Sequence, residues 1–526
     1  MDSHFDVVVF GTGLTESIAA ASLSKAGYKV VHIDTNPYYG GNEASLTPDE
    51  LTQWCSRIPP SKPNCCDYAC KSQTGTVQSS RQYSLSLSPS VIPSSGSLIT
   101  SLIASGVARY GGFRLLDKAA VYSSGELKTI PGSKEAIFKS KDISLVDKRR
   151  LMRFLLFASG DFESAKELEG RSEMPFIEFL EEVFFLNQDL AGTVANALAL
   201  CTSPKEHTIL ALQRTRQYLR SSGKYGPSPF LIGHYGGLGE LAQGYCRTCA
   251  VSGGTYILGR RVLSIHDMAS PTNECADTTT PRFKISVDDV SEPIFADLII
   301  SSDDYLPQEL LPVDVLGSAP SSSVETSAFC IAIVDQPLAF SKLSSQVPLP
   351  EVDADSAHST TQQSPANDDI STALIIFPPE ARRQTNGVVT VLIEGEETFS
   401  CPRGKHILYI STPCLNLSSD ANESLDPKDI LRPYLMDTLR LLSNGPIPEP
   451  AFSAYYLRNL STSNLPLSPK ERVIISPPLS SHFATKGDEA ARNAETIFWE
   501  VVKRLPKGDG VESLWPPLEE DQNDED

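Results

Sequence analysis

The opening of the chain contains the pattern that most constrains its fold. Residues 5–10, Phe-Asp-Val-Val-Val-Phe, are an apolar run with the length of a buried parallel strand. Gly11 and Gly13 predict a tight turn, residues 14–26 predict a helix, and residues 28–33 predict a second strand. This order indicates a βαβ unit of the kind that opens dinucleotide-binding folds.

One position of the dinucleotide-binding fingerprint is changed. In Gly-x-Gly-x-x-Gly, the third glycine lets the helix pack closely on the strand, and the pyrophosphate binds at the helix N-terminus. That third position is Glu16, which adds bulk and negative charge beside the phosphates. Asp34, after the second strand, matches the acid that binds a ribose. We therefore expect the fold to be retained without a cofactor. The alternative is a flavin-dependent amine oxidase or desaturase, which would be yellow.

Apolar residues take helical spacing between about residues 140 and 222. Ser144 and Asp147 resemble a capping box that opens a helix through Leu151 and Leu155. Further helices are predicted at 188–200, 206–219 and 488–505, and strands at 255–258, 298–301, 328–334, 373–377, 388–393 and 407–410.

The return of strands after these helices predicts a discontinuous domain. The expected fold class is α/β, with an FAD/NAD(P)-binding-like, Rossmann-type βαβ domain and an inserted all-helical domain. The expected boundaries are 1–136 and 223–510 for the α/β domain, 137–222 for the helical domain and 511–526 for an acidic tail. Residues 56–82, 269–281 and 343–372 are predicted as exposed loops, the last one disordered because it is rich in Ser, Pro, Asp and Gln.

Charge argues against several classes of partner. The formal net charge of -20 disfavours nucleic acid and anionic membranes as main partners, and no apolar run has the ~20 residues of a membrane span. The first residues lack the basic and apolar regions of a signal peptide. We therefore expect a cytoplasmic protein whose 11 cysteines are reduced thiols.

The cysteines leave two alternatives open. A thiol oxidoreductase could use Cys246 and Cys249, but the pair lacks a thioredoxin-like setting, and a buried structural role is the competing interpretation. A zinc site could be formed by Cys55, Cys65, Cys66 and Cys70, although their spacing is irregular and their segment is loop-like. We expect no metal and no catalytic residue.

Several motifs occur along the chain in one order. They are residues 10–17 (FGTGLTES), 36–41 (NPYYGG), 224–230 (KYGPSPF), 235–247 (YGGLGELAQGYCR) and 253–256 (GGTY). This set closely resembles the family of GDP-dissociation inhibitors and Rab escort proteins. The resemblance covers residues 5–50 and about 83–265 well, and the C-terminal half more loosely.

The resemblance implies a flavoprotein-like domain without flavin, a helical domain and a surface that binds Rab-type small GTPases. The residues that match the family's Rab-binding platform are Tyr39, Glu240, Gln243, Arg247, Thr255 and Ile257. Glu240, Gln243 and Arg247 have the spacing of one helix face, which can bind the polar switch regions of a GTPase. The alternative is that Glu240 and Arg247 neutralise each other. Ala242 replaces a proline of the family motif, which puts the stiffness of that segment in question.

Local sequence favours the escort branch of the family. Residues 41–45 (GNEAS), 145–155 and 246–251 (CRTCAV) resemble it, and the long insertions suit it. The resemblance then implies a non-catalytic, fungal-type accessory that presents unprenylated, GDP-bound Rab to the Rab geranylgeranyl transferase dimer. It also implies that the protein shields the geranylgeranyl lipid of its client and contacts membranes transiently. A GDP-dissociation inhibitor that recycles prenylated Rab is the alternative.

Overall fold

The computed structural model describes residues 4–57, 66–130, 144–268, 281–302, 305–306, 310, 324–340, 370–379, 387–415, 425–461, 471–507 and 510–517. Two predicted loops lie mostly outside the described residues. They are residues 269–280 of the predicted loop at 269–281, and residues 343–369 of the predicted disordered loop at 343–372. The predicted acidic tail lies outside the described residues from residue 518 onward.

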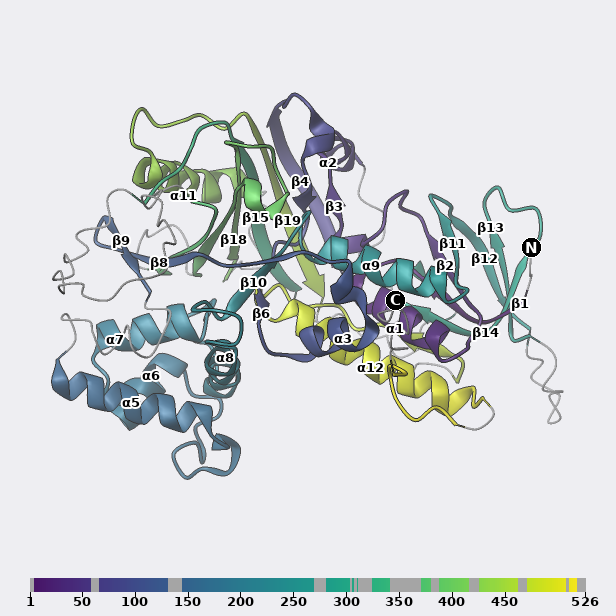
Figure 1. Cartoon of the computed structure of the whole chain (residues 1–526), viewed down its shortest axis with the longest axis horizontal. Helices are drawn as coiled ribbons and strands as arrows, with labels where there is room; N and C mark the ends of the chain where they lie inside the picture. Colours follow the sequence, from purple (N-terminus) through teal and green to yellow (C-terminus); the bar gives the residue numbers. More distant parts are fainter. Residues whose placement is uncertain are drawn as a thin grey trace, which may run out of the picture.

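A seven-stranded sheet contains the predicted βαβ unit (Figure 1). Its strands are β1 (His4–Phe10), β2 (Val30–Asp34), β11 (Thr255–Leu258), β12 (Val262–Asp267), β13 (Phe283–Val287), β14 (Ile294–Ser301) and β20 (Val473–Ile475). β1 pairs in parallel with β2 and β14, and β11 pairs in parallel with β2. Val7, Val8 and Val9 are fully buried, which explains the continuous apolar run of this strand.

Helices cover one face of this sheet. α1 (Leu14–Lys25) packs between α9 (Leu238–Val251) and α12 (Lys486–Arg504), and α3 (Ser97–Ser105) packs on α12. The small side chains of Ala19, Ala20 and Ala21 are fully buried, so α1 can approach both neighbours closely. Because α1, α9 and α12 come from distant parts of the sequence, this layer is assembled from both halves of the chain.

An eight-stranded sheet forms the second layer of strands. In spatial order its strands are β4 (Cys66–Gly75), β19 (Phe452–Ser461), β15 (Val324–Val334), β18 (His406–Pro413), β17 (Val389–Glu394), β16 (Thr372–Phe377), β8 (Lys118–Ser123) and β9 (Glu126–Thr129). α11 (Pro427–Leu442) packs on it, and small sheets pair β3 (Ser45–Leu46) with β5 (Leu85–Ser86), and β10 (Phe230–Gly233) with β6 (Ile92–Pro93) and β7 (Phe113–Leu115).

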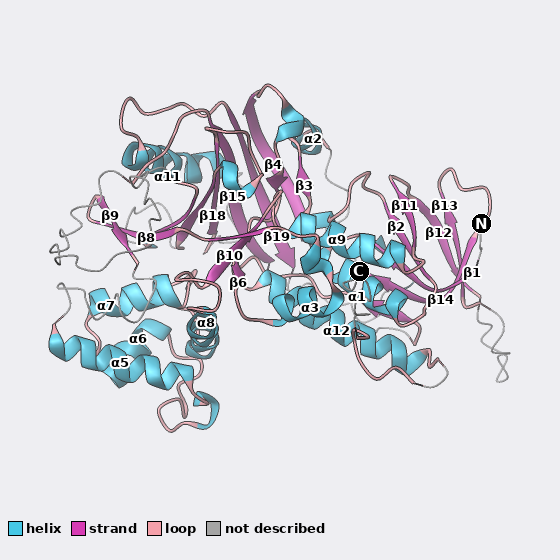
Figure 2. Ribbon diagram, in the orientation of Figure 1, coloured by secondary structure: helices cyan, strands magenta, loops and turns pink. Residues whose placement is uncertain are grey.

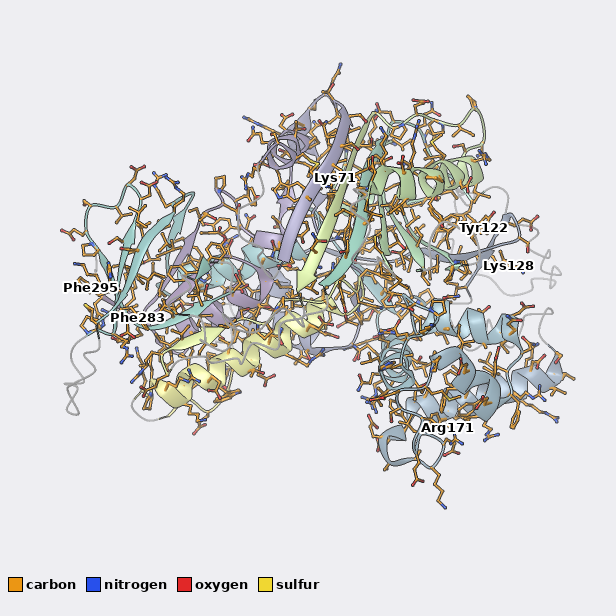
Figure 3. All side chains as sticks on the ribbon, turned by 180° about the vertical axis from the view of Figure 1, so that it is seen from behind. Lys71, Tyr122, Lys128, Arg171, Phe283 and Phe295 are labelled. Carbon is orange, nitrogen blue, oxygen red and sulfur yellow. A yellow bond between two sulfur atoms is a disulfide. The ribbon has the colours of Figure 1, made fainter. Side chains whose placement is uncertain are left out.

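A block of helices lies beside the eight-stranded sheet and away from the seven-stranded one (Figures 1 and 2). It contains α5 (Leu145–Ser159), α6 (Phe176–Phe184), α7 (Gln188–Thr193), a π-helical turn (Val194–Leu198) and α8 (Thr208–Ser221). Figure 3 shows Arg171 of this block and Phe295 of the seven-stranded sheet at opposite ends of the molecule. The predicted cap is confirmed, since Ser144 Oγ accepts a hydrogen bond from the Asp147 N–H at 3.1 Å. The domain boundaries 137–222 stay a prediction.

Phenylalanine rings form the core of the helical block. Phe154, Phe176, Phe179 and Phe184 are almost completely inaccessible to solvent. The Phe154 and Phe184 rings meet edge to face with 5.3 Å between their centroids, and Phe179 contacts Phe184 at 5.7 Å. These rings form the helical part of an apolar core that continues into the eight-stranded sheet.

One prediction about local structure is wrong. Residues 56–82 were expected to form a loop, but β4 (Cys66–Gly75) pairs with β19 along the edge of the eight-stranded sheet. β4 is the edge strand of this sheet in the part of the chain that the structure describes, and polar residues are common on such strands because they oppose pairing with other molecules, so hydrophobic alternation is weak. The predicted helix at 188–200 is confirmed up to Leu198, and its part after Thr193 is a π-helical turn.

The expectation of reduced cysteines is wrong for one pair. Cys55, at the end of α2 (Pro48–Cys55), forms a disulfide with Cys70 of β4, across 5.0 Å between their Cα atoms. This pairing depends on the unpredicted strand, which brings Cys70 beside α2. No helix among the residues that the structure describes is long and apolar enough to cross a membrane.

Candidate functional site

Asp34 is fully buried, and its carboxylate binds groups of the chain itself. Its Oδ2 accepts hydrogen bonds from the backbone N–H and the hydroxyl of Thr12, at 2.9 and 2.7 Å. Its Oδ1 accepts from the Asn36 N–H at 2.8 Å and from the Tyr305 hydroxyl at 2.9 Å. The Tyr305 ring also lies against Gly11, which has φ +89°. The acceptor positions that would bind a ribose are therefore occupied from within the protein.

The N-terminus of α1 faces a second carboxylate. Glu43 Oε2 accepts a hydrogen bond from the Leu14 N–H at 3.3 Å, where a pyrophosphate would otherwise meet the positive end of the helix dipole. The loop before Glu43 lies directly on the glycine-rich turn: a Cβ at Gly41 would be 3.2 Å from the Gly13 nitrogen. A side chain at Gly41 would be strained by this tight contact and by its φ of +51°, so glycine at this position favours the close approach of the loop to the phosphate space.

A dinucleotide cofactor does not fit these residues. Glu16 is buried beside Gly13, and burial raises the pKa of its carboxyl to about 7. Burial also raises the pKa of Glu43, against the opposing effect of Arg458 and Lys486. The side chains of Glu16 and Glu43 thus take up the space of the phosphates, and in their ionised form they would also repel a nucleotide. The expectation that the chain works without a cofactor stays a prediction.

The predicted platform residues of α9 lie on one exposed face of that helix. Gln243 and Arg247 are exposed and Glu240 is half-buried, whereas Leu241 and Tyr245 face the core. Burial raises the pKa of Glu240. The guanidinium of Arg247 lies over the ring of Tyr110, with 4.8 Å from Cζ to the ring centroid.

Glu240 and Arg247 do not neutralise each other. Within the described parts of the chain, neither forms an ion pair, and Glu240 and Gln243 form no side-chain hydrogen bond. The structure therefore does not support the alternative in which these charges are satisfied internally. Their donors and acceptors are open to another molecule.

The remaining predicted platform residues lie around the edge strand β11. Tyr39 meets the ring of Tyr256 edge to face at 5.7 Å, which fixes the tyrosine near α9. Neighbouring residues of a strand point to opposite faces, so Thr255 and Ile257 project away from Tyr256. Ile257 packs against the cluster on the other side of the sheet. The structure thus places Tyr39 beside Tyr256 and close to Cys246 of α9, and it places Thr255 and Ile257 on the edge strand of the sheet.

Cys246 and Cys249 lie inside the protein, beneath the exposed face of α9. Their sulfur atoms are 3.2 Å from Ser17 Oγ and 3.1 Å from Ser24 Oγ, respectively, so they tie α9 to α1. Burial raises the pKa of Cys246 to about 12, which disfavours a reactive thiolate. These contacts support a structural role for the pair.

Among the described residues, no observation supports the alternative of a zinc site. Cys55 and Cys70 are joined in the disulfide, and Cys65 lies outside the described residues. Elsewhere in the described chain, no group of three or more His, Cys, Asp or Glu residues could hold a metal ion.

An apolar groove of about 600 Å³ lies beside the platform. Ile99, Leu102 and Ile103 of α3 form one wall, and Phe113, Leu231 and Tyr225 close it toward the segment that follows α8. This groove was not predicted from the sequence. The signal was Tyr225 in the motif at 224–230, an exposed aromatic residue in a segment after the last helix of the block.

The fold and the site together define a class of protein: a flavoprotein-like α/β protein whose own carboxylates fill the cofactor position and whose helix α9 exposes polar groups. The sequence profile of the GDP dissociation inhibitor family, GDI, matches residues 1–278. The chain belongs to this family, as its motifs predicted.

Curated relatives come from two branches of the family. The chain is 30% identical over 416 residues to Rab proteins geranylgeranyltransferase component A of Saccharomyces cerevisiae, covering 77% of this chain and 61% of that protein. It is 30% identical over 420 residues to component A of Candida albicans, covering 78% and 60%. It is 33% identical over 270 residues to Rab GDP dissociation inhibitor beta of Canis lupus familiaris, covering 50% and 58%. The chain thus spans about three fifths of the length of these relatives.

Solved structures confirm the predicted fold class. Rab GDI from Plasmodium falciparum aligns with a TM-score of 0.63 at 21% identity, covering 95% of this chain and 98% of that chain. An oxidoreductase from Methanosarcina mazei aligns with a TM-score of 0.54 at 14% identity, covering 94% and 100%. A Rab GDI and an oxidoreductase thus share this fold, so the fold alone does not distinguish their functions.

Proposed function

We propose that this chain is a Rab escort protein, a non-catalytic carrier that binds unprenylated, GDP-bound Rab GTPases and presents them to Rab geranylgeranyl transferase. The observation that carries the proposal is the exposed face of α9, where Glu240, Gln243 and Arg247 have no polar side-chain partner among the described residues. Open polar groups on a rigid helix suit the polar switch regions of a GTPase. The relatives named component A support the escort branch.

The apolar groove beside α9 suits the flexible C-terminal tail of the client. The lining of the groove includes Ala108, shortly before Tyr110, whose ring lies under Arg247 of α9, and it includes Tyr225, which follows α8. A tail that follows the groove from the platform would reach the helical block. Holding the tail in this way raises its local concentration near the transferase.

We assign the lipid and the transferase to the helical domain at 137–222. Its helices pack around phenylalanine rings, and a modest displacement of one helix would open an apolar space for a geranylgeranyl chain. On its outer surface, α5 exposes the apolar side chains of Leu145, Val146 and Leu156. Exposed apolar side chains grouped on one element are typical of a surface that binds a partner. In this proposal the protein works in the cytosol and contacts membranes only during delivery.

A recycling GDP-dissociation inhibitor is the second candidate, because Rab GDP dissociation inhibitor beta matches the chain at 33% identity. The test is reconstitution of prenylation with the transferase, geranylgeranyl diphosphate and an unprenylated GDP-bound Rab. We expect little product until this protein is added. If the protein gives no stimulation yet extracts prenylated Rab from membranes, the recycling function replaces the escort function.

A further inference from the structure

Two exposed aromatic residues lie outside the platform and the groove. Tyr235, between β10 and α9, and Phe399, after the short 3-10 helix Glu396–Thr398, stack with 5.7 Å between their ring centroids and 25° between their planes. Their exposed fractions are 47% and 54%. His234 meets Phe399 edge to face at 4.9 Å. We call these three residues the aromatic patch.

The backbone holds both rings outward at a conformational cost. Tyr235 has φ +53° and Phe399 has φ +54°, a left-handed conformation that aromatic residues rarely adopt. Such strain persists only where the surrounding structure fixes it, and it is concentrated at functional sites. Two hydrogen bonds fix it in this protein: the Tyr235 N–H donates to the Thr398 carbonyl at 3.1 Å, and the Gly236 N–H donates to Ser400 Oγ at 3.1 Å.

The charges at the rim of the patch are paired within the chain. Arg114, beside His234, forms ion pairs with Glu397 and with Asp117. Because these charges are already paired, we expect the aromatic patch to bind a partner through its apolar rings. Large, rigid aromatic side chains are the residues that most often anchor protein interfaces.

The patch continues the exposed face of α9. A side chain at Gly112 would overlap His234, and a Cβ at Gly111 would be 3.6 Å from Leu241 of α9. Tyr110, the next residue back along the chain, lies under Arg247. The segment 110–112 therefore runs beside α9 and joins the aromatic patch at one end to Arg247 at the other.

We infer that the aromatic patch is a second anchor of the GTPase-binding surface, which takes an apolar side chain of the client beside its polar switch regions. This inference rests on the proposed function. Exposed aromatic residues can also insert into an anionic membrane, but the net charge of -20 would repel such a membrane. The two loops that carry Tyr235 and Phe399 are held together by hydrogen bonds, and a rigid surface of this kind suits a partner of defined shape.

The test uses the full chain and GDP-bound, unprenylated Rab in a binding titration. Tyr235→Asn and Phe399→Asn remove the rings, and asparagine tolerates the left-handed backbone. We expect each variant to weaken the affinity about tenfold or more at an unchanged melting temperature. Phe185→Asn is the matched control, because Phe185 is also exposed with φ +58° but lies in the helical block, and it should bind as the wild type does.

Each other outcome has a defined meaning. If Arg247→Ala weakens binding while Tyr235→Asn and Phe399→Asn bind normally, the inference is overturned and the proposed function stands. If the wild-type protein binds no Rab, both are overturned. If the two variants keep their Rab affinity but lose binding to vesicles of phosphatidylserine and phosphatidylcholine, the patch contacts membranes and the inference is overturned.

Discussion

The carboxylate of Glu43 accepts a hydrogen bond from the backbone N–H of Leu14, the first residue of α1. This contact places an anion of the chain at the helix end that binds phosphate in dinucleotide-binding folds. The carboxylate of Asp34, at the ribose end of the same site, accepts hydrogen bonds from Thr12, Asn36 and Tyr305. The fold is thus retained while both ends of its cofactor site are filled.

We expect the purified protein to contain no flavin, and Glu16→Gly to bind none when flavin is added. Restoring the third glycine removes one carboxyl group, but Glu43 and the loop at Gly41 still fill the phosphate space. Absorption spectroscopy after dialysis against FAD measures the bound flavin. A flavin band at one equivalent in the wild-type protein would contradict the prediction.

The sequence predicted the elements whose pattern is local. The apolar run of β1, the glycine turn and the Ser144 cap depend on neighbouring residues, and the structure confirms them. β4 was missed because its pairing with β19 comes from a strand almost four hundred residues away in sequence (Tyr68 opposite Arg458). A half-paired polar edge strand leaves little trace in hydrophobic periodicity.

The candidate site was predicted where helical spacing defines it. Glu240, Gln243 and Arg247 share a face because of their spacing alone. The part played by Glu43 could not be predicted, because the hydrogen bond to Leu14 depends on how the loop folds back over the turn. The stack of Tyr235 on Phe399 joins two distant loops and leaves no signal in either one.

Glu16→Gln should stabilise the protein above pH 7 and have no effect below pH 4.5. Burial raises the pKa of Glu16 from 4.5 to about 7, so the folded state retains a proton that the unfolded state releases. Its contribution to stability is therefore fully present below pH 4.5 and is lost as pH rises through about 7. A shift of this size corresponds to a gain of about 3 kcal/mol for the glutamine variant at high pH.

Denaturant unfolding of both proteins from pH 4 to 8 measures this difference. Glu178→Gln, on the exposed surface of α6, is the control and should follow the wild type at every pH. Equal stability of the Glu16→Gln variant and the wild type at pH 8 would show that burial does not raise the pKa of Glu16.

Glu240→Ala and Arg247→Ala should weaken binding of GDP-bound Rab while the melting temperature stays nearly unchanged. Neither side chain forms an ion pair within the described chain, so its removal costs little in folding. Loss of a charged contact in a buried interface costs about 2–5 kcal/mol, which corresponds to at least a thirtyfold weaker affinity. Lys503→Ala, an exposed charge on α12, is the control. Normal binding by both α9 variants would show that these residues are not part of the interface.

The outer surface of α5 should be needed for prenylation but not for Rab binding. Leu145 and Leu156 have exposed fractions of 77% and 65%. They are about three helical turns apart and therefore share one face of the helix. An exposed apolar line on a helical block is expected to have a partner, and the transferase is the partner that an escort protein needs.

The variant that tests this surface is Leu145→Glu with Leu156→Lys. The acid lies in the first turn of α5 and the base in its last turn, so both complement the helix dipole and the helix should remain folded. We expect the double variant to bind GDP-bound Rab normally and to lose stimulation of the transferase. Leu210→Glu replaces an exposed leucine in the first turn of α8 by an acid, as Leu145→Glu does in α5, and it should retain stimulation. If the double variant stimulates as well as the wild type, the transferase docks on another surface. If it loses Rab binding as well, the helical block has lost its fold or takes part in binding the GTPase, and the separation of the two roles fails.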